Sequence, residues 1–176
     1  MCMAEGVPAG PDAGSTGFTS AAEALRTGVA FADFLNSPDV ADLEPAALGA
    51  VLESIGEIQS KLAAAHAGFL RRFDGHQAHH ADGYGTSSAW LAAMTKLSKN
   101  DAKAAVRQMR VLGERPLLAL GMVRGEISDS WAREIAAWLK RLPEELRDGT
   151  EESVAEAAAA GACLENLATI VAHALA

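Results

Sequence analysis

The sequence predicts an all-α protein, a multi-helix bundle of about seven or eight helices. Alanine, the best helix former and a poor strand former, is abundant in nearly every segment of the 176 residues. Hydrophobic residues make up 49% of the chain but aromatic residues only 5%, so we expect a core of small and branched aliphatic side chains. The apolar positions recur at helical spacing.

The N-terminal part is expected to differ from the rest. Residues 1–17 are rich in Gly and Pro and have few large apolar side chains, so we predict a disordered leader. Residues 18–176 are predicted to form a single helical domain. Its first helix begins at Ser20, because Ser20 and Glu23 form a capping-box pattern, and it ends near Asn36.

The longest predicted helix begins at Pro45, since proline suits the first helical position, and ends at Gly75. Its apolar residues follow spacings close to a coiled-coil seam: Leu48, Leu52, Ile55, Ile58, Leu62, Phe69 and Phe73. Two interpretations stay open. The first is one long spine helix of a bundle, which is favoured because Gln59 and His66 interrupt the heptads. The second is homodimerisation through residues 44–73.

Capping residues and prolines mark the later helices. We expect them at Thr86–Thr95, Ser98–Gly113, Pro116–Val123, from Ser128, from Pro143 and at Leu164–Leu175. The helix from Ser128 has one apolar stripe, formed by Trp131, Ile135, Trp138, Leu139 and Leu142. Both tryptophans are therefore expected to pack into the core rather than stack on bases.

The sequence has five histidines, each of which is a candidate metal ligand or core residue. His76, His79 and His80 have a spacing compatible with metal binding, but glycines flank them and few carboxylates are near. We interpret this segment as a solvated loop and predict no metal site. His66 and His173 lie among apolar helical positions, so we expect both to be partly buried.

Several classes of protein are excluded. Cys2 and Cys163 form no CxxC pair, so we expect neither a disulfide framework nor a cysteine zinc site. The chain has neither a G-x-S-x-G motif nor a phosphate-binding loop, so we predict no catalytic residue, cofactor or small-molecule ligand. No apolar run reaches about 18 residues and the N-terminus is unlike a signal peptide. We therefore expect no membrane association and a cytoplasmic location.

The main functional signal is a row of cations on the helix Ser98–Gly113. At about 100° per residue, one stripe carries Lys99, Lys103, Arg107 and Arg110, and it lies about 130° from the apolar face. The segment 96–115 carries a net charge of +4 in a chain of net charge −8. A helix-turn-helix places its second helix in the major groove of DNA, and a cationic stripe on that helix would then face the DNA.

We expect Lys99 and Lys103, near the helix start, to reach base edges, and Arg107 and Arg110 to meet phosphates. The alternative is a solvated cationic face without a ligand. The negative charge of the whole chain favours this alternative, as does Lys96, which occupies a turn position where glycine is usual.

Three stretches carry a family resemblance: "RRFDG", "DGYGTSSAWLAAMTKLSKNDAKAAVRQMRVLGERP" and "ALGMVRGEISDSWAREIAAWLKRLPEEL". Their order resembles the actinobacterial domain of unknown function 222 family, also known as a mycobacterial repeat family, over residues 44–176. The resemblance implies a helical domain that precedes a C-terminal HNH nuclease module. The catalytic residues of that module have no counterpart here. We expect the natural chain to continue after residue 176 and this part not to cleave.

The resemblance implies a non-catalytic helical domain of an HNH-endonuclease-like protein, and the basic helix face predicts that this domain binds or positions DNA. The alternative is a protein-interaction or dimerisation module that binds no nucleic acid. The seam of residues 44–73 and the acidity of the chain favour this alternative.

Overall fold

The computed structural model describes residues 17–40 and 43–175, and its regular structure is helical. These residues form eight α-helices, two short 3-10 helices and no strand, which confirms the predicted all-α fold. The chain divides into two compact units, Met1–Leu48 and Gly49–Ala176. Apart from Gly17, the predicted disordered leader lies outside the described residues.

Helix α1, Ala21–Leu35, begins where the capping-box pattern predicts. The Ser20 hydroxyl accepts the backbone N–H of Glu23 at 3.1 Å, and the Glu23 carboxylate accepts the backbone N–H of Thr19 at 2.9 Å. The helix ends at Asn36. All of its side chains are at least partly exposed.

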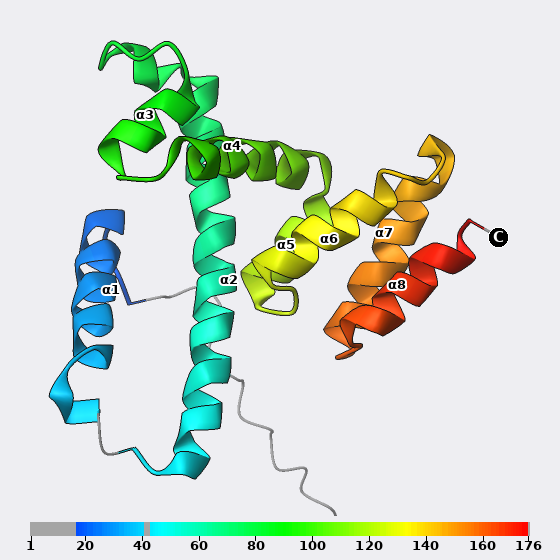
Figure 1. Ribbon diagram of the computed structural model, residues 1–176, viewed down its shortest axis with the longest axis horizontal. Coiled ribbons are helices and arrows are strands. Elements are labelled where there is room, and N and C mark those ends of the chain that lie inside the picture. The colour runs from blue at the N-terminus through cyan, green and yellow to red at the C-terminus, as the bar shows by residue number, and fades with distance from the viewer. Residues whose placement is uncertain (1–16, 41–42, 176) are drawn as a thin grey trace, which may run out of the picture. The chain divides into compact units, whose positions relative to one another are not determined.

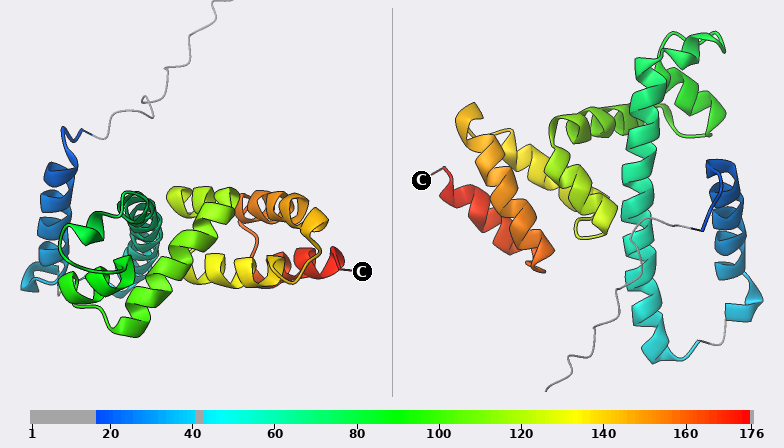
Figure 2. Two further views of the ribbon diagram at one scale, coloured as in Figure 1. Left: turned by 90° about the horizontal axis from the view of Figure 1, so that it is seen from above. Right: turned by 180° about the vertical axis from the view of Figure 1, so that it is seen from behind.

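The helices that follow are labelled in Figure 1. They are α2 (Pro45–Gly75), α3 (Ser87–Met94), α4 (Lys99–Glu114), α5 (Pro116–Arg124), α6 (Asp129–Leu139), α7 (Glu144–Ala159) and α8 (Leu164–His173), with 3-10 helices at Pro38–Val40 and Ala78–His80. In the unit Gly49–Ala176, α3 packs against α4, and α7 packs against α5 and α8. Figures 1 and 2 show α4 leading from α3 into the cluster of α5 to α8.

Helix α2 is the long helix that the sequence predicts. Its buried residues are Ser60, at its midpoint, and Ala67 and Leu70 in its second half, where the last two join the core. His66 was expected to be partly buried, and this is wrong. It is exposed because no helix of the unit Gly49–Ala176 covers that side of α2.

The core of the unit Gly49–Ala176 is formed mainly by side chains of the segment from α4 to α8. Its largest fully buried side chains include Leu118, Met122, Ile127, Ile135, Leu139, Leu142, Val154 and Leu167. The stripe of α6 faces this core as predicted, and Trp131 and Trp138 pack half-buried at its edge. His173 was also expected to be partly buried but is exposed, because it follows the buried Val171 by half a helical turn.

The predicted caps position these helices. Thr86, Ser98 and Ser128 each accept the backbone N–H of the third residue after them at 3.1 Å. Pro116 is the first residue of α5, and Gly125 ends it with φ 82, a left-handed conformation that glycine adopts at little cost. The helices therefore begin and end close to their predicted bounds.

Candidate nucleic-acid interface

Helices α3 and α4 form a helix-turn-helix pair. In the turn between them, the Thr95 hydroxyl donates to the Leu91 carbonyl at 2.6 Å. Lys96 follows with φ 58, in the left-handed region where a non-glycine residue is uncommon. The turn thus has the backbone conformation that glycine usually supplies, with a cationic side chain in its place.

The two sides of α4 are chemically distinct. Its buried face consists of Ala102, Val106, Met109 and Leu112. The predicted cations Lys99, Lys103, Arg107 and Arg110 are all exposed, and we call these four residues the cation face. A helix that presents apolar residues at this spacing to the core presents the residues between them to solvent.

The charges of the cation face are not neutralised by the fold. Across residues 17–40 and 43–175, none of its four side chains forms an ion pair with a carboxylate. By contrast, Lys61 pairs with Glu57, and Arg133 with Asp129, each one helical turn apart. The cation face therefore offers its full charge to an anion from outside.

A cavity of about 480 Å³ lies between α3 and α4, beside Lys99 and Lys103. The hydroxyl groups of Thr86 and Ser88 line it, together with the aliphatic side chains of Ala89, Ala92, Ala93 and Leu97. Hydroxyl groups bind phosphates and methyl groups contact the thymine methyl group in protein–DNA interfaces. This surface therefore combines the polar and apolar groups that such an interface uses.

The structure separates the other two cations from this cavity. Arg107 lines a different cavity, next to α6 and α7, and Arg110 lines neither of the two. Lys99 and Lys103 are thus brought together with the α3–α4 groove, whereas Arg107 and Arg110 extend the charge along α4.

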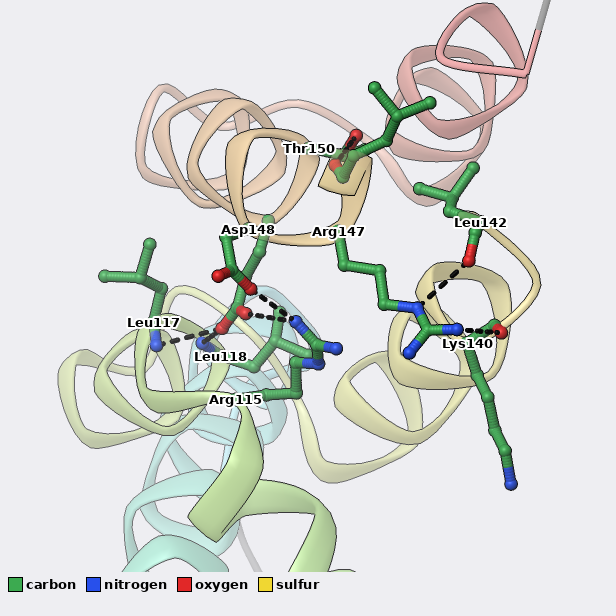
Figure 3. A network of polar contacts seen from close by, with 10 residues as sticks. Arg115, Leu117, Leu118, Lys140, Leu142, Arg147, Asp148 and Thr150 are labelled. Carbon is green, nitrogen blue, oxygen red and sulfur yellow. Dashed lines mark hydrogen bonds and ion pairs between the residues drawn. The ribbon is translucent and has the colours of Figure 1, made fainter. Parts of the chain in front are cut away.

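Arg115 does not belong to the exposed charge of the segment 96–115, although it contributes to its net charge. Its side chain is 15% exposed, and Nη1 lies 3.1 Å from Asp148 Oδ1 and 3.3 Å from Glu151 Oε2. Glu151, which is 3% exposed, also accepts the backbone N–H groups of Leu117 and Leu118 at 3.0 and 3.2 Å (Figure 3). This carboxylate therefore neutralises Arg115 and caps the start of α5.

Sequence reasoning missed Glu151. The available signal was its spacing, because Glu151 falls on the same face of α7 as the buried Val154 and Ala158. A carboxylate at a core position is rarely left without a partner.

The histidine segment is only partly the solvated loop that the sequence predicts, because His76 and His80 are exposed but His79 is not. His79 is buried, and its Nδ1 lies 3.1 Å from the Ser87 hydroxyl, which donates to Asp74 Oδ1 at 2.6 Å. The ring of Phe73 packs against the Trp90 ring, with centroids 4.4 Å apart. Because Ser87 is only 2% exposed, its hydroxyl has no access to a substrate. The arrangement ties the end of α2 to the start of α3.

Two carboxyl groups with shifted pKa values lie at helix starts away from the cation face. The hydroxyl and then the backbone N–H of Thr19 lower the pKa of Glu23. The backbone N–H of Glu165 and then the Cys163 thiol lower the pKa of Glu165. Each shift reflects hydrogen bonds to the charged carboxylate.

Residues 17–40 and 43–175 contain no group of three or more His, Cys, Asp or Glu side chains placed to hold a metal ion. Within the same ranges, no helix is long and apolar enough to cross a membrane.

Residues 49–174 match the family model described as "Domain of unknown function (DUF222)". The matched range includes helices α3 to α8, and thus both the cation face and Glu151. No curated protein and no solved structure gives a significant match to the chain.

Proposed function

The chain belongs to the DUF222 family, and we propose that the cation face of α4 binds double-stranded DNA. The observation that carries this proposal is that four exposed cations on one helix face have no carboxylate partner in the described residues. An α-helix fits the major groove, which phosphates border on both sides. Duplex DNA is thus a polyanion of suitable shape and charge.

The position of each cation along α4 suggests its role. Lys99 and Lys103 lie near the helix start, beside the α3–α4 cavity, where a recognition helix contacts base edges. Arg107 and Arg110 follow one to three turns later and would meet phosphates. Thr86 and Ser88, at the start of α3, add hydroxyl donors for the backbone.

The net charge of −8 limits the strength of binding but does not oppose the proposal. At about 0.1 M salt, charges separated by more than about 10 Å are largely screened. The local charge of α4 therefore dominates close to the DNA. We expect moderate affinity with a strong dependence on salt.

Fluorescence anisotropy with a labelled duplex of about 20 base pairs tests the proposal between about 50 and 200 mM salt. The variant Lys99→Gln/Lys103→Gln/Arg110→Gln removes three charges without introducing repulsion. The loss of Arg110 from a phosphate should make the slope of log K against log salt about 1 unit less steep, and the change should reach about 3 units if Lys99 and Lys103 also neutralise phosphates.

The matched control is Arg26→Gln/Lys61→Gln/Arg124→Gln, which removes three exposed cations from other helices. It should bind DNA nearly as well as the original chain. Equal losses in the two triple variants, or affinity that does not depend on salt, would refute binding through the cation face.

For the whole protein we propose that this domain positions DNA for cleavage by a separate HNH nuclease module, and that it acts in the cytoplasm. The family resemblance supports this context, and the domain is not proposed to cleave DNA itself. The coding sequence after Ala176 provides the test. A reading frame that continues into an H…N…H segment supports the proposal, and a stop codon contradicts it.

A second candidate is homodimerisation through α2, without nucleic-acid binding. It is favoured by Leu52, Leu62 and Phe69, whose side chains are 69%, 60% and 57% exposed on this helix. Light scattering over a range of concentrations should then show a dimer that Leu52→Gln/Leu62→Gln dissociates. A monomer at every concentration would contradict it.

A further inference from the structure

A second cationic site lies off the cation face, in the cavity between α4, α6 and the start of α7. The cavity measures about 430 Å³, within the range of small-ligand sites. Five cations line it, Arg107, Arg115, Arg133, Lys140 and Arg147, together with the single carboxylate Glu114.

The fold neutralises two of these five cations. Arg115 pairs with Glu151 and Asp148, and Arg133 Nη2 lies 3.2 Å from Asp129 Oδ2. The other three, Arg107, Lys140 and Arg147, have no ion pair within the ranges that the structure describes. They come from α4, the end of α6 and α7, and thus converge from separate elements on one cavity.

Arg147 is held in place by neutral groups. It is half-buried, and its Nε donates to the Leu142 carbonyl at 3.0 Å and its Nη2 to the Lys140 carbonyl at 3.3 Å (Figure 3). These two bonds orient the guanidinium at the end of α6 but supply no full negative charge. Such a preoriented guanidinium is a good partner for a phosphate, which accepts two parallel hydrogen bonds.

Gln108 adds an unused donor to the same cavity. Its side chain lines the cavity, and its Nε2 atom is buried without a hydrogen-bond partner among the described residues. Buried polar atoms are usually satisfied by protein, water or a ligand. The cavity therefore combines three cations that form no ion pair with an unpaired amide donor, a set of groups that suits an acceptor-rich anion.

We propose that this cavity binds a phosphate group, carried either by a free phosphorylated small molecule or by the DNA backbone. Aliphatic side chains, including Ala104, Val111 and Ala136, leave room for an uncharged part of the ligand. Lys140 and Arg147 lie outside the cation face, so the site does not depend on the proposed role of that face. Arg107 is shared by both surfaces.

The experiment is an NMR titration of the full chain with inorganic phosphate and with adenosine monophosphate, at constant ionic strength. We expect saturable shifts of the amide signals that line the cavity. Lys140→Gln should weaken phosphate binding about tenfold, a change expected for the loss of one charged contact. Arg141→Gln is the matched control, because Arg141 is the exposed neighbour outside the cavity lining and should leave the affinity unchanged.

Duplex DNA forms the second arm of the experiment. If Lys140→Gln weakens both phosphate and DNA binding, the group belongs to the DNA backbone. If it weakens phosphate and leaves DNA binding intact, the ligand is a free phosphorylated molecule. Absence of saturable shifts, or equal affinities of the Lys140→Gln and Arg141→Gln variants, would overturn the proposal. Failure of the cation-face variant to lose DNA binding refutes that face alone, because the phosphate titration is independent of it.

Discussion

Cations at the beginning of α4 are exposed and form no ion pair in the described residues, whereas the cation directly after its end is paired and mostly buried. At the beginning, Lys99 and Lys103 are exposed and have no ion pair in the described residues. Directly after the end, Arg115 is 15% exposed and contacts Glu151, which is 3% exposed. In the first region the charge remains available to a ligand, and in the second it stabilises the fold. The number of cations in a segment therefore does not measure the charge that the segment offers to a partner.

The largest expected loss of stability follows removal of Glu151 from its pair with Arg115. Glu151→Ala leaves the backbone N–H groups of Leu117 and Leu118 without their acceptor and leaves the Arg115 guanidinium with only the exposed Asp148, so the free energy of unfolding should fall by about 3–5 kcal/mol. Urea unfolding followed by circular dichroism measures this change. Glu152→Ala, at the exposed neighbouring position, should change the free energy of unfolding by less than about 0.5 kcal/mol. If both variants change the free energy of unfolding by a similar amount, the Arg115–Glu151 pair does not stabilise the fold, and the contrast between the two ends of α4 is wrong.

A smaller change in stability is expected at Lys96, which lies in the turn just before α4. Its φ of 58 is strained for a residue with a Cβ, so Lys96→Gly should stabilise the domain by about 0.5–1 kcal/mol. Lys96→Ala removes the same charge but keeps the strain, and its stability should stay close to that of the original chain. If alanine stabilises as much as glycine, charge repulsion and not backbone strain is the cause. Chemical denaturation of the two variants in parallel provides the comparison.

The cation face should matter little for stability. Lys99, Lys103 and Arg107 are spaced four residues apart, and like charges at this spacing repel each other on a helix. Lys99→Gln/Lys103→Gln/Arg110→Gln should therefore raise the free energy of unfolding by a few tenths of a kcal/mol, about 0.3. A loss above about 1 kcal/mol would mean that these side chains serve the fold, as Arg115 does.

The smallest expected effect is the loss of the Thr19–Glu23 hydrogen bonds at low pH, which concerns only the start of α1. Glu23 is a charged group at the start of α1, and hydrogen bonds from Thr19 lower its pKa below the ordinary value of 4.5. A lowered pKa in the folded state means that the contribution is complete above about pH 4.5 and is lost as the pH falls through the lowered pKa. NMR shifts of the Thr19 and Glu23 amide protons should follow this titration, which Glu23→Gln abolishes. A midpoint at or above 4.5 would contradict the hydrogen bonds.

Local signals in the sequence predicted the helices and the cation face. Ser98 and Pro116 mark helix starts through hydrogen bonding and backbone geometry that involve only their neighbours. The separation of Lys99 and Lys103 from the apolar face follows from the helical repeat alone. These features need no knowledge of how the helices pack.

The remaining features depend on contacts between side chains of one element and groups of another, at separations that helical periodicity does not give. Glu151 caps α5 from a position 34 residues after Leu117, and Arg147 of α7 is oriented by the Leu142 carbonyl, which lies before that helix. His79 was expected to be solvated, yet it is buried because Ser87 and Phe73 enclose it. Helical periodicity predicts which face is covered but does not identify the covering residue.

The Glu151 cap also has a consequence for synthesis of the chain on the ribosome. The first turn of α5 leaves the ribosome well before Glu151 does, and until then the Leu117 and Leu118 amides can bond only to water. Completion of α5 and docking of α7 should therefore be a single late event of co-translational folding. A nascent chain that is arrested before residue 151 would expose the apolar side of α5 and become a target for chaperones.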